Sequence, residues 1–547
     1  MQSTENLLRR LKELNEIGIA LSQQRDINSL LETILIAAKR ITNADAGTLY
    51  LHEPEQRVLR FEIMRTDSLN IAMGGTSGVP ITFYPIHLYD QNGNPIHSMV
   101  VTHSALSGET VNIPDAYTAE GYDFSGTKKF DVKTGYHSQS FLAVPMRNHE
   151  NEMIGVLQLI NAQDRQSGAV IPFSGDDQQL LESLASQAAI ALTNRRLIAQ
   201  LEELFESFIK LINTAIDDKS PYTGGHCARV PVLTMMLAEA VNRTTQGPLK
   251  DFAMTEKDRR ELKMAGLLHD CGKITTPVHV VDKATKLQTI FDRIHLLDTR
   301  FEVLKRDAEI GMLRALAEDK EQKTQDKDFA VAAQRLSSEY QARIRQLDDD
   351  REFIRHCNIG GEAMPEEAQR RIHQIAAYQW HDVNGKVCNF LNDDEVENLT
   401  IRGGTLIAAE REIINHHITV TIKMLESLPW PNHLKNVPEY AGGHHERMDG
   451  KGYPRGLTRE QMSVQARLMG IADIFEALTA KDRPYKDGKT LTESLTILGK
   501  FKENGHIDPD LFDVFIREKV YLEYANRFLN KAQIDEVDVS KIPGYVP

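Results

Sequence analysis

The sequence has few cysteines and no long apolar run. Its 547 residues include four cysteines, none in a Cys-x-x-Cys spacing. This argues against a thiolate zinc site and a disulfide framework, and it is typical of a reducing cytoplasm. No window approaches the ~18 uninterrupted apolar residues that a membrane span needs, and the charged N-terminal stretch lacks the apolar core of a signal peptide. We therefore predict a cytoplasmic protein that makes no contact with a membrane.

The chain also has fewer positively charged than negatively charged side chains. The chain has 64 Lys and Arg against 78 Asp and Glu, a formal net charge of −14. This balance argues against broad binding to duplex nucleic acid, so an anionic ligand would need metals or a few placed cations. The hydrophobic share of 41% and the charged share of 26% are ordinary for a globular protein, and the length predicts about two to four domains.

The N-terminal third combines helical and strand patterns. Residues 1 to about 40 carry apolar side chains at helical spacing, and residues 176–197 do so again. Between them lie short apolar runs such as VLRFEIM and MIGVLQLIN, separated by polar turns, which predict strands of an antiparallel sheet. The pattern predicts an α+β domain over residues 1–195.

This segment resembles a GAF domain, most clearly in GETVNIPDAY (108–117), FDVKTGYHSQSFLAVPM (130–146) and IGVLQLINA (154–162). The resemblance implies an α/β sensor that binds a small molecule, often a cyclic nucleotide, or one that simply dimerises. Residues 173–177 are only a loose counterpart of the signature of nucleotide-binding members. Both roles stay open, and thermal-shift screening of the N-terminal domain with cyclic nucleotides would separate them.

A heptad seam continues beyond this domain. Its apolar residues recur at alternating spacings of four and three: Leu197, Leu201, Leu204, Phe208 and Leu211. Such a seam predicts a two-stranded parallel coiled coil over residues 196–218, and hence a homodimer. The alternative is one amphipathic helix packed on its own domain. We prefer the dimer because the stripe runs without a breaker into the next segment, where a coiled coil would transmit a twist of the sensor.

The C-terminal half places imidazole and carboxylate groups beside apolar helical stretches. The candidates are His226, His269, Asp270, His444, His445 and Asp473. Asp473 lies within an apolar helix, where a lone carboxylate is costly unless it is paired or bound to a metal. Each candidate alone is also compatible with a core or surface residue. Together they predict a cluster for iron, manganese or zinc, with a bridging aspartate allowing two metals.

The pair His269-Asp270 resembles the defining doublet of the HD superfamily of phosphohydrolases, and HHERMDGKGYP (444–454) resembles the motif of its HD-GYP subfamily. The match covers about residues 205–300 and 399–500. The resemblance implies an all-α domain over residues 219–547 that hydrolyses cyclic di-GMP with two divalent metal ions, iron or manganese. It also implies a diguanylate cyclase as a partner of the Gly-Tyr-Pro loop.

The resemblance also assigns the metal ligands. The mid-domain histidine of the family lies in a Glu-Ile-x-x-x-His pattern, which the segment from Glu412 fits with His417 as the ligand. Its neighbour His416 and the more distant His295 stay as alternatives. The implied grouping is His226, His269, Asp270 and Asp473 around one metal, with Asp270, His417, His444 and His445 around the other.

Two departures from the family pattern matter. Where some members carry a glutamate that helps to hold a third metal, this sequence has Tyr222, so we predict a binuclear site. Many more residues separate His269 from His417 than in the family, because a charged and mostly helical insertion occupies about residues 290–400. The histidines and two cysteines of the insertion have no recognisable ligand spacing.

The resemblance implies hydrolysis of cyclic di-GMP to pGpG, or on to GMP, by a hydroxide that bridges the two metals. Asp270 and Lys273 are then catalytic. Lys273 and Arg483 are candidates for holding phosphate oxygens, although Arg483 could equally form a surface salt bridge, and Gly452 and Tyr453 are assigned to the substrate site. Two alternatives stay open, a phosphodiesterase for 3′,3′-cyclic GMP-AMP and an inactive cyclic dinucleotide receptor.

Overall fold

The computed structural model describes residues 2–24, 26–219, 225–322, 326–361, 363–480 and 488–546. The chain divides into two compact units, residues 1–205 and 206–547, so the boundary lies inside the predicted connector. The first unit contains a β-sheet and the second is mostly helical, as the sequence predicts. Within the described ranges, no helix is both long and apolar enough to cross a bilayer.

The first unit is built on one antiparallel sheet. Its elements are α1 (Gln2–Gln23), α2 (Ile27–Thr42), β1 (Ala44–Glu53), β2 (Val58–Thr66), β3 (Ile71–Gly74), β4 (Ile86–His87), α3 (Val100–Ser107), β5 (Val111–Ile113), α4 (Ser125–Thr134), β6 (Phe141–Arg147), β7 (Met153–Gln163), β8 (Val170–Ile171) and the first part of α5 (Gly175–Lys219). The strand order is β3-β2-β1-β7-β6-β5, with β4 paired to β2 and β8 paired to β7.

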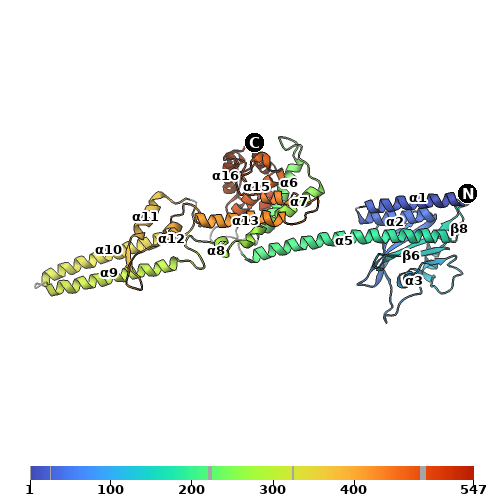
Figure 1. Ribbon diagram of the computed structural model, residues 1–547, viewed down its shortest axis with the longest axis horizontal. Helices are drawn as coiled ribbons and strands as arrows, with labels where there is room; N and C mark the ends of the chain where they lie inside the picture. The colour runs from blue at the N-terminus through green and yellow to red at the C-terminus, as the bar shows by residue number, and fades with distance from the viewer. Residues whose placement is uncertain are drawn as a thin grey trace. The chain divides into compact units, whose positions relative to one another are not determined.

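Apolar side chains cover both faces of this sheet, because alternate residues of a strand point to opposite sides. Leu49 and Leu157 contribute to a core formed with α1, α2 and α5. Their neighbours Tyr50 and Val156 contribute to a second core formed with α3. Figure 1 shows the three helices on one side of the sheet and α3 on the other. Burial on both faces explains why the central strands are nearly continuous apolar runs.

The single N-terminal helix predicted over residues 1–40 is in fact two helices. α1 ends at Gln23, and α2 begins at Ile27. The break occurs because Asp26 caps α2, where its carboxylate accepts the amide hydrogen of Ser29 at 2.7 Å. The sequence carries a signal of this break, because residues 22–26 are all polar, but the prediction extended one helix across them.

α5 is one continuous helix of 45 residues that includes both the last helix of the first unit and the predicted connector. At its start, the Asp177 carboxylate accepts the backbone amide of Ser174 at 3.0 Å and its hydroxyl at 2.7 Å. The segment that loosely matches the nucleotide-binding signature is thus used to begin a helix. The predicted seam is exposed, with Leu201 at 64% and Leu211 at 63% of their full accessibility.

The second unit has a helical core interrupted by an insertion. The core elements are α6 (His226–Arg243), α7 (Glu256–Leu268), η1 (Cys271–Thr275), α8 (Val278–Val281), α13 (Ala408–Glu426), α14 (Val437–Gly442), η2 (Arg459–Gln461), α15 (Val464–Thr479), α16 (Leu491–Glu503), α17 (Pro509–Arg517), α18 (Val520–Phe528), η3 (Lys531–Gln533) and η4 (Val539–Lys541). Side-chain hydrogen bonds cap the first turn of several of these helices. The Thr255 hydroxyl and the Asp258 carboxylate form a reciprocal capping box at α7, and the Ser463 hydroxyl caps α15.

One glycine allows the two halves of the split core to meet. A Cβ atom on Gly272 would lie 2.0 Å from the carbonyl oxygen of His417 and 2.6 Å from the amide nitrogen of Thr421. Only glycine therefore permits η1 to pack this closely on α13. The Gly272 amide also donates to the Thr421 hydroxyl at 2.9 Å. This contact brings the segment around Asp270 beside His417, although the insertion separates them in sequence.

The insertion has a core of its own. It contains α9 (Ile294–Gln322), α10 (Asp326–Asn358), α11 (Glu366–Ala376), β9 (Gln379–His381), β10 (Val387–Asn389) and α12 (Asp393–Leu399). Phe301, Leu347 and Phe390 are among the buried residues of this core. The mostly helical insertion also contains the β9–β10 hairpin. The turn of this hairpin is organised by the carboxylate of Asp382, which accepts two backbone amides at 2.9 Å.

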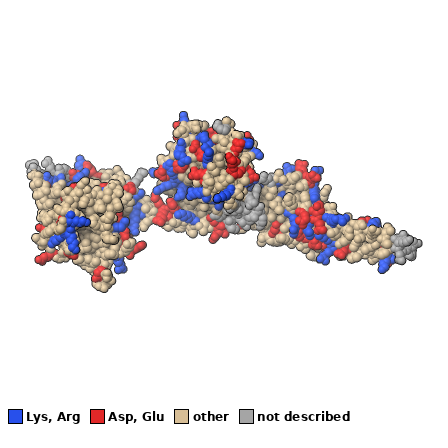
Figure 2. All heavy atoms as spheres, turned by 180° about the vertical axis from the view of Figure 1, so that it is seen from behind, with Lys and Arg blue, Asp and Glu red and all other residues tan. Residues whose placement is uncertain are grey.

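Charged side chains cover the long α9–α10 hairpin. Ion pairs join its two helices, such as Lys305 with Asp348 at 2.5 Å and Arg355 with Asp298 at 2.8 Å. Figure 2 shows Lys and Arg interspersed with Asp and Glu on this hairpin. Partly exposed pairs of this kind contribute little stability each, so the charges are consistent with a solvated surface.

We expect the intact chain to form a dimer through the exposed seam of α5. Replacing Leu201 and Leu204 together by Glu places charges in the seam, so light scattering should show a shift from dimer to monomer. The matched control is Glu206→Lys, because about 100° per residue puts this exposed position on the opposite side of the helix. A monomeric unmodified chain, or a dimer that survives the double leucine replacement, would contradict the expectation.

Candidate metal centre

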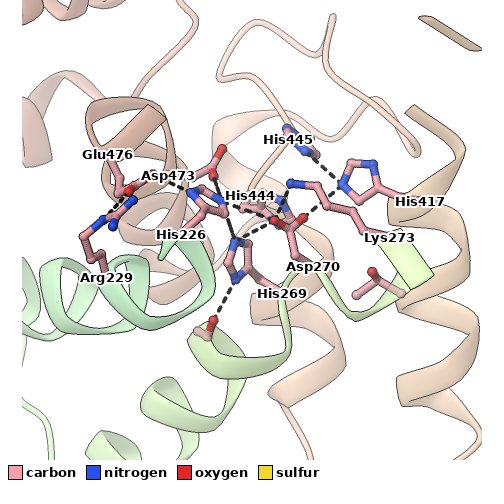
Figure 3. A network of polar contacts seen from close by, with 12 residues as sticks. His226, Arg229, His269, Asp270, Lys273, His417, His444, His445, Asp473 and Glu476 are labelled. Atoms are coloured by element: carbon pink, nitrogen blue, oxygen red, sulfur yellow. Dashed lines mark hydrogen bonds and ion pairs between the residues drawn. The ribbon is translucent and has the colours of Figure 1, made fainter. Parts of the chain in front are cut away.

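The seven predicted ligands come from several elements of the second unit and converge on one site (Figure 3). They are His226 at the start of α6, His269 and Asp270 after α7, His417 in α13, His444 and His445 after α14, and Asp473 in α15. Three overlapping groups have ligand atoms within 4.8 Å of one another: His226, His269 and Asp473; His269, Asp270 and His444; His417, His444 and His445.

His226 lies at the centre of the first group. Its Nε2 atom is 3.1 Å from Oδ1 of Asp473, 3.2 Å from Oδ2 of Asp270 and 3.3 Å from Nε2 of His269. His269 is completely buried and Asp270 is almost so. The packing of α6 against α15 and α7 brings these residues together.

The other oxygen of Asp270 faces the group of His417, His444 and His445. Nε2 of His417 lies 3.2 Å from Oδ1 of Asp270 and 3.3 Å from Nε2 of His445. His444 belongs to this group and also to the group with His269 and Asp270, and its ring contacts the rings of His269 and His445. Asp270 thus presents separate oxygens to the two groups, which is the geometry of a bridging carboxylate.

Backbone carbonyls fix the orientation of three of the imidazole rings. Nδ1 of His269 lies 2.7 Å from the Gly266 oxygen, Nδ1 of His417 lies 2.5 Å from the Ile414 oxygen, and Nδ1 of His444 lies 2.7 Å from the Ala441 oxygen. A carbonyl only accepts hydrogen bonds, so each Nδ1 carries a proton and each Nε2 of a neutral ring offers a lone pair. In all three cases the acceptor is three residues earlier, so the local helical turn orients the ring.

Lone pairs consequently face one another across this site. Nε2 of His444 and Oδ1 of Asp270 are buried without a hydrogen-bond donor, and Nε2 of His417 points at that same oxygen as a second acceptor. Buried acceptors that face each other are costly unless a cation lies between them. Imidazole and carboxylate without thiolate suit iron, manganese or zinc. The residues therefore fit a divalent metal centre.

The ionisation of the site favours such a cation. Burial, together with the neighbouring His269, lowers the pKa of His444 to about 4. Burial and His444 hold the pKa of His445 well below its usual range. Burial opposes the ionisation of Asp473, but the hydrogen bond with His226 and the neighbouring histidines together outweigh it and lower the pKa of the carboxyl. Near neutral pH, His444 and His445 are therefore neutral imidazoles beside ionised carboxylates, which is the form that binds metals.

Lys273 lies at the edge of the site. Its Nζ atom is 2.5 Å from Oδ2 of Asp270, and although burial opposes it, the charge of Asp270 raises the pKa of the ammonium group. The carbonyl oxygens of Lys273 and Ile274 accept hydrogen bonds from Lys219, the last residue of α5. The predicted position of Lys273 beside the doublet is therefore observed, together with a contact from the connector that the sequence did not indicate.

The Gly-Tyr-Pro loop packs directly on the metal centre. The Tyr453 ring stacks on the His445 ring, with centroids 4.8 Å apart and planes inclined by 19°. A Cβ atom on Gly452 would lie 2.4 Å from the amide nitrogen of Arg447, so glycine is needed for the loop to return this closely. The structure thus shows how Gly452 and Tyr453 support the site from within the protein, while their contact with substrate stays a prediction.

A buried carboxylate holds the rest of this loop. The two oxygens of Glu446 accept the backbone amides of Arg455 at 2.8 Å and Leu457 at 2.9 Å. Glu446 was not among the predicted site residues, because its partners are backbone groups that no side-chain pattern reveals. It fixes the path of the loop that follows the paired histidines.

Glu476 is a second functional residue that the sequence left without a role. It is completely buried, and its oxygens lie 2.5 Å from Nδ1 of His226 and 2.6 Å from Nε of Arg229. Burial lowers the pKa of an imidazole, but the carboxylates of Asp270, Asp473 and Glu476 raise the pKa of His226 well above its usual range. The available signal was its position three residues after Asp473, on the same side of α15.

The remaining predicted residues lie elsewhere. His416 is exposed on α13 whereas its neighbour His417 is buried, so the helix turns only His417 into the site. The side chain of His295 is 77% exposed on α9, 4.0 Å from Asp298. Arg483 and Tyr222 lie outside the described residues.

Comparisons with known proteins agree with the two halves of the chain. A family profile described as a GAF domain matches residues 26–192, and two profiles described as HD domains match residues 223–369 and 394–511. The GAF domain of an Acinetobacter phosphoenolpyruvate-protein phosphotransferase covers 35% of this chain and 98% of its own, with 16% identity and a TM-score of 0.26.

Curated relatives match short stretches of the chain. A 3′3′-cGAMP-specific phosphodiesterase of Vibrio cholerae is 44% identical over 81 residues, 15% of this chain and 19% of the relative. A cyclic di-GMP phosphodiesterase of Pseudomonas aeruginosa is 45% identical over 74 residues, 14% of this chain and 17% of the relative. The chain thus spans about a fifth of the length of these relatives. Sequence, fold and profiles together show that this chain carries a GAF domain followed by an HD domain.

Proposed function

We propose that this protein is a metal-dependent phosphodiesterase that hydrolyses cyclic di-GMP to pGpG. The observation that supports this best is the set of buried lone pairs that face one another around Asp270. The HHERMDGKGYP segment supplies His444 and His445, and its Tyr453 stacks on His445. Short stretches of the chain match relatives that are named as cyclic dinucleotide phosphodiesterases. We propose two divalent metal ions, iron or manganese, as cofactors.

The residues of the chain have distinct roles in this proposal. Two divalent ions held here would supply Lewis acidity and an activated water for in-line displacement at phosphorus. Asp270 holds the two positions at a fixed separation, because each of its oxygens faces one ligand group. Lys273 carries a positive charge at the edge of the site, where an ammonium group can hold a phosphoryl oxygen and offset the developing negative charge.

A second candidate substrate is 3′,3′-cyclic GMP-AMP. The relative from Vibrio cholerae that is 44% identical over 81 residues is named for that substrate. Both dinucleotides contain the same phosphodiester group, and they differ in one base. The metal centre would therefore treat them alike, and residues that contact the bases would discriminate between them.

We further propose that the GAF domain regulates the site through α5, as part of a homodimer. α5 runs unbroken from the last helix of the GAF domain to Lys219. The Lys219 ammonium donates to the carbonyl oxygens of Lys273 and Ile274 in η1. A rotation or shift of α5 would disturb these hydrogen bonds and move Lys273 relative to Asp270.

Substitutions of Asp270 and of two adjacent histidines test the metal centre. We expect Asp270→Ala to lose bound metal and turnover of both dinucleotides, because the carboxylate faces both ligand groups. His417→Ala should lose about half of the bound metal and at least about 100-fold in kcat, as expected for loss of a ligand to one of two cooperating metals. His416→Ala is the matched control and should change neither. Metal content by elemental analysis and product analysis by chromatography measure both effects.

Other outcomes of that experiment would redirect the proposal. Bound metal in the unmodified protein without product from either dinucleotide would favour a receptor. Loss of metal in Asp270→Ala with unchanged turnover would place the reaction elsewhere. Faster hydrolysis of 3′,3′-cyclic GMP-AMP than of cyclic di-GMP would select the second substrate.

The contact of α5 with η1 generates a separate prediction. We expect Lys219→Met to lower kcat several-fold while the metal content stays unchanged, because the side chain holds the carbonyls of Lys273 and Ile274 but reaches no predicted ligand. The control is Lys210→Met, an exposed lysine on the same helix. Equal kcat values for the two variants would contradict a role for this contact.

A further inference from the structure

His226 is held differently from three other histidines of the metal centre. Nδ1 of His269, His417 and His444 each faces a backbone carbonyl of its own helical turn. Nδ1 of His226 instead lies 2.5 Å from Oε2 of Glu476, a carboxylate 250 residues away in the sequence. The two ligand groups around Asp270 are therefore supported by chemically different neighbours.

Glu476 is itself anchored by a cation. Its other oxygen, Oε1, accepts from Nε of Arg229 at 2.6 Å, and Glu476 is fully buried. Arg229 follows His226 by three residues on α6, and Glu476 follows Asp473 by three residues on α15. Each helix thus supplies one predicted ligand and one residue of the supporting pair (Figure 3).

A carboxylate has a stronger effect on an imidazole than a carbonyl has. Its negative charge pulls the Nδ1 proton and raises the basicity of Nε2, which strengthens the bond that Nε2 forms with a metal. A buried carboxylate without a partner is costly, and the Arg229 guanidinium removes that cost. The pair also locks the rotamer of His226 at the start of its helix.

We propose that Glu476, held by Arg229, is a positioning residue that strengthens His226 as a ligand and makes the two metal positions unequal. The position bounded by His226, His269 and Asp473 depends on this pair for its affinity. The position bounded by His417, His444 and His445 does not. This inference rests on the proposed binuclear centre.

The test is Glu476→Gln, which keeps the size of the side chain. An amide has one acceptor and one donor group, so it can accept from His226 or from Arg229 but not from both. In a titration of metal-free protein with Mn²⁺ against a chelator, we expect two binding steps for the unmodified protein. In the variant, the dissociation constant of one step should rise about 10–100-fold while that of the other stays unchanged.

Glu261→Gln is the matched control. Glu261 is also buried, and it accepts two hydrogen bonds, from the amide nitrogen of Asn436 at 2.6 Å and from its Nδ2 at 3.1 Å, but it contacts no predicted ligand. This variant should keep both binding steps. Melting temperatures of the metal-free proteins show whether either substitution simply unfolds the domain.

The outcomes separate this inference from the function on which it rests. No metal binding by the unmodified protein contradicts the proposed binuclear centre. Two unchanged steps in Glu476→Gln overturn the role of Glu476 and leave that centre standing. Glu476→Gln could lower the melting temperature of the metal-free protein more than Glu261→Gln does. In that case, the metal titration of a second variant, Arg229→Met, tests the role of Glu476. It should weaken the same single step, and two unchanged steps there also overturn the inference.

Discussion

The second unit depends on one electrostatic constraint. Buried hydrogen-bond acceptors face one another, and no hydrogen atom lies between them to form a hydrogen bond. Nε2 of His417 and Oδ1 of Asp270 are 3.2 Å apart, and Nε2 of His444 has no donor. The fold holds these atoms together although each would be better solvated in water. A bound divalent cation would remove the conflict, so metal binding and the stability of this region should be coupled.

The fold satisfies this constraint with short local contacts and one long-range contact. A carbonyl three residues earlier orients each of three imidazole rings, so a single helical turn presents a lone pair correctly. Gly272 then lets η1 approach α13 closely enough for Asp270 to reach His417. Because the insertion between them has a separate core, it lengthens the chain without disturbing this contact. Lys283 ties it to the core through Asn398 and Glu410.

The same site is also held from its two ends. At one end, Tyr453 stacks on His445 and Glu446 fixes the loop that follows. At the other end, Lys219 of α5 holds the carbonyls of η1. The Gly-Tyr-Pro loop, which identified the family in the sequence, thus has a packing role against a ligand. A helix that begins in the GAF domain supplies the opposite support.

The sequence by itself determined the order of the domains, the ligand types and the place of the insertion. Motif residues and the periodicity of apolar side chains are local properties, so they predicted the GAF sheet, the α5 seam and the choice of His417 over His416 as the expected ligand. The break at Asp26 was missed because the prediction extended one helix across the polar residues 22–26. Only the tertiary structure decided that Asp270 divides its oxygens between two groups and that Glu476 supports His226. Such distances depend on how α6, α13 and α15 pack, and residue spacing within one element cannot specify the separation between elements.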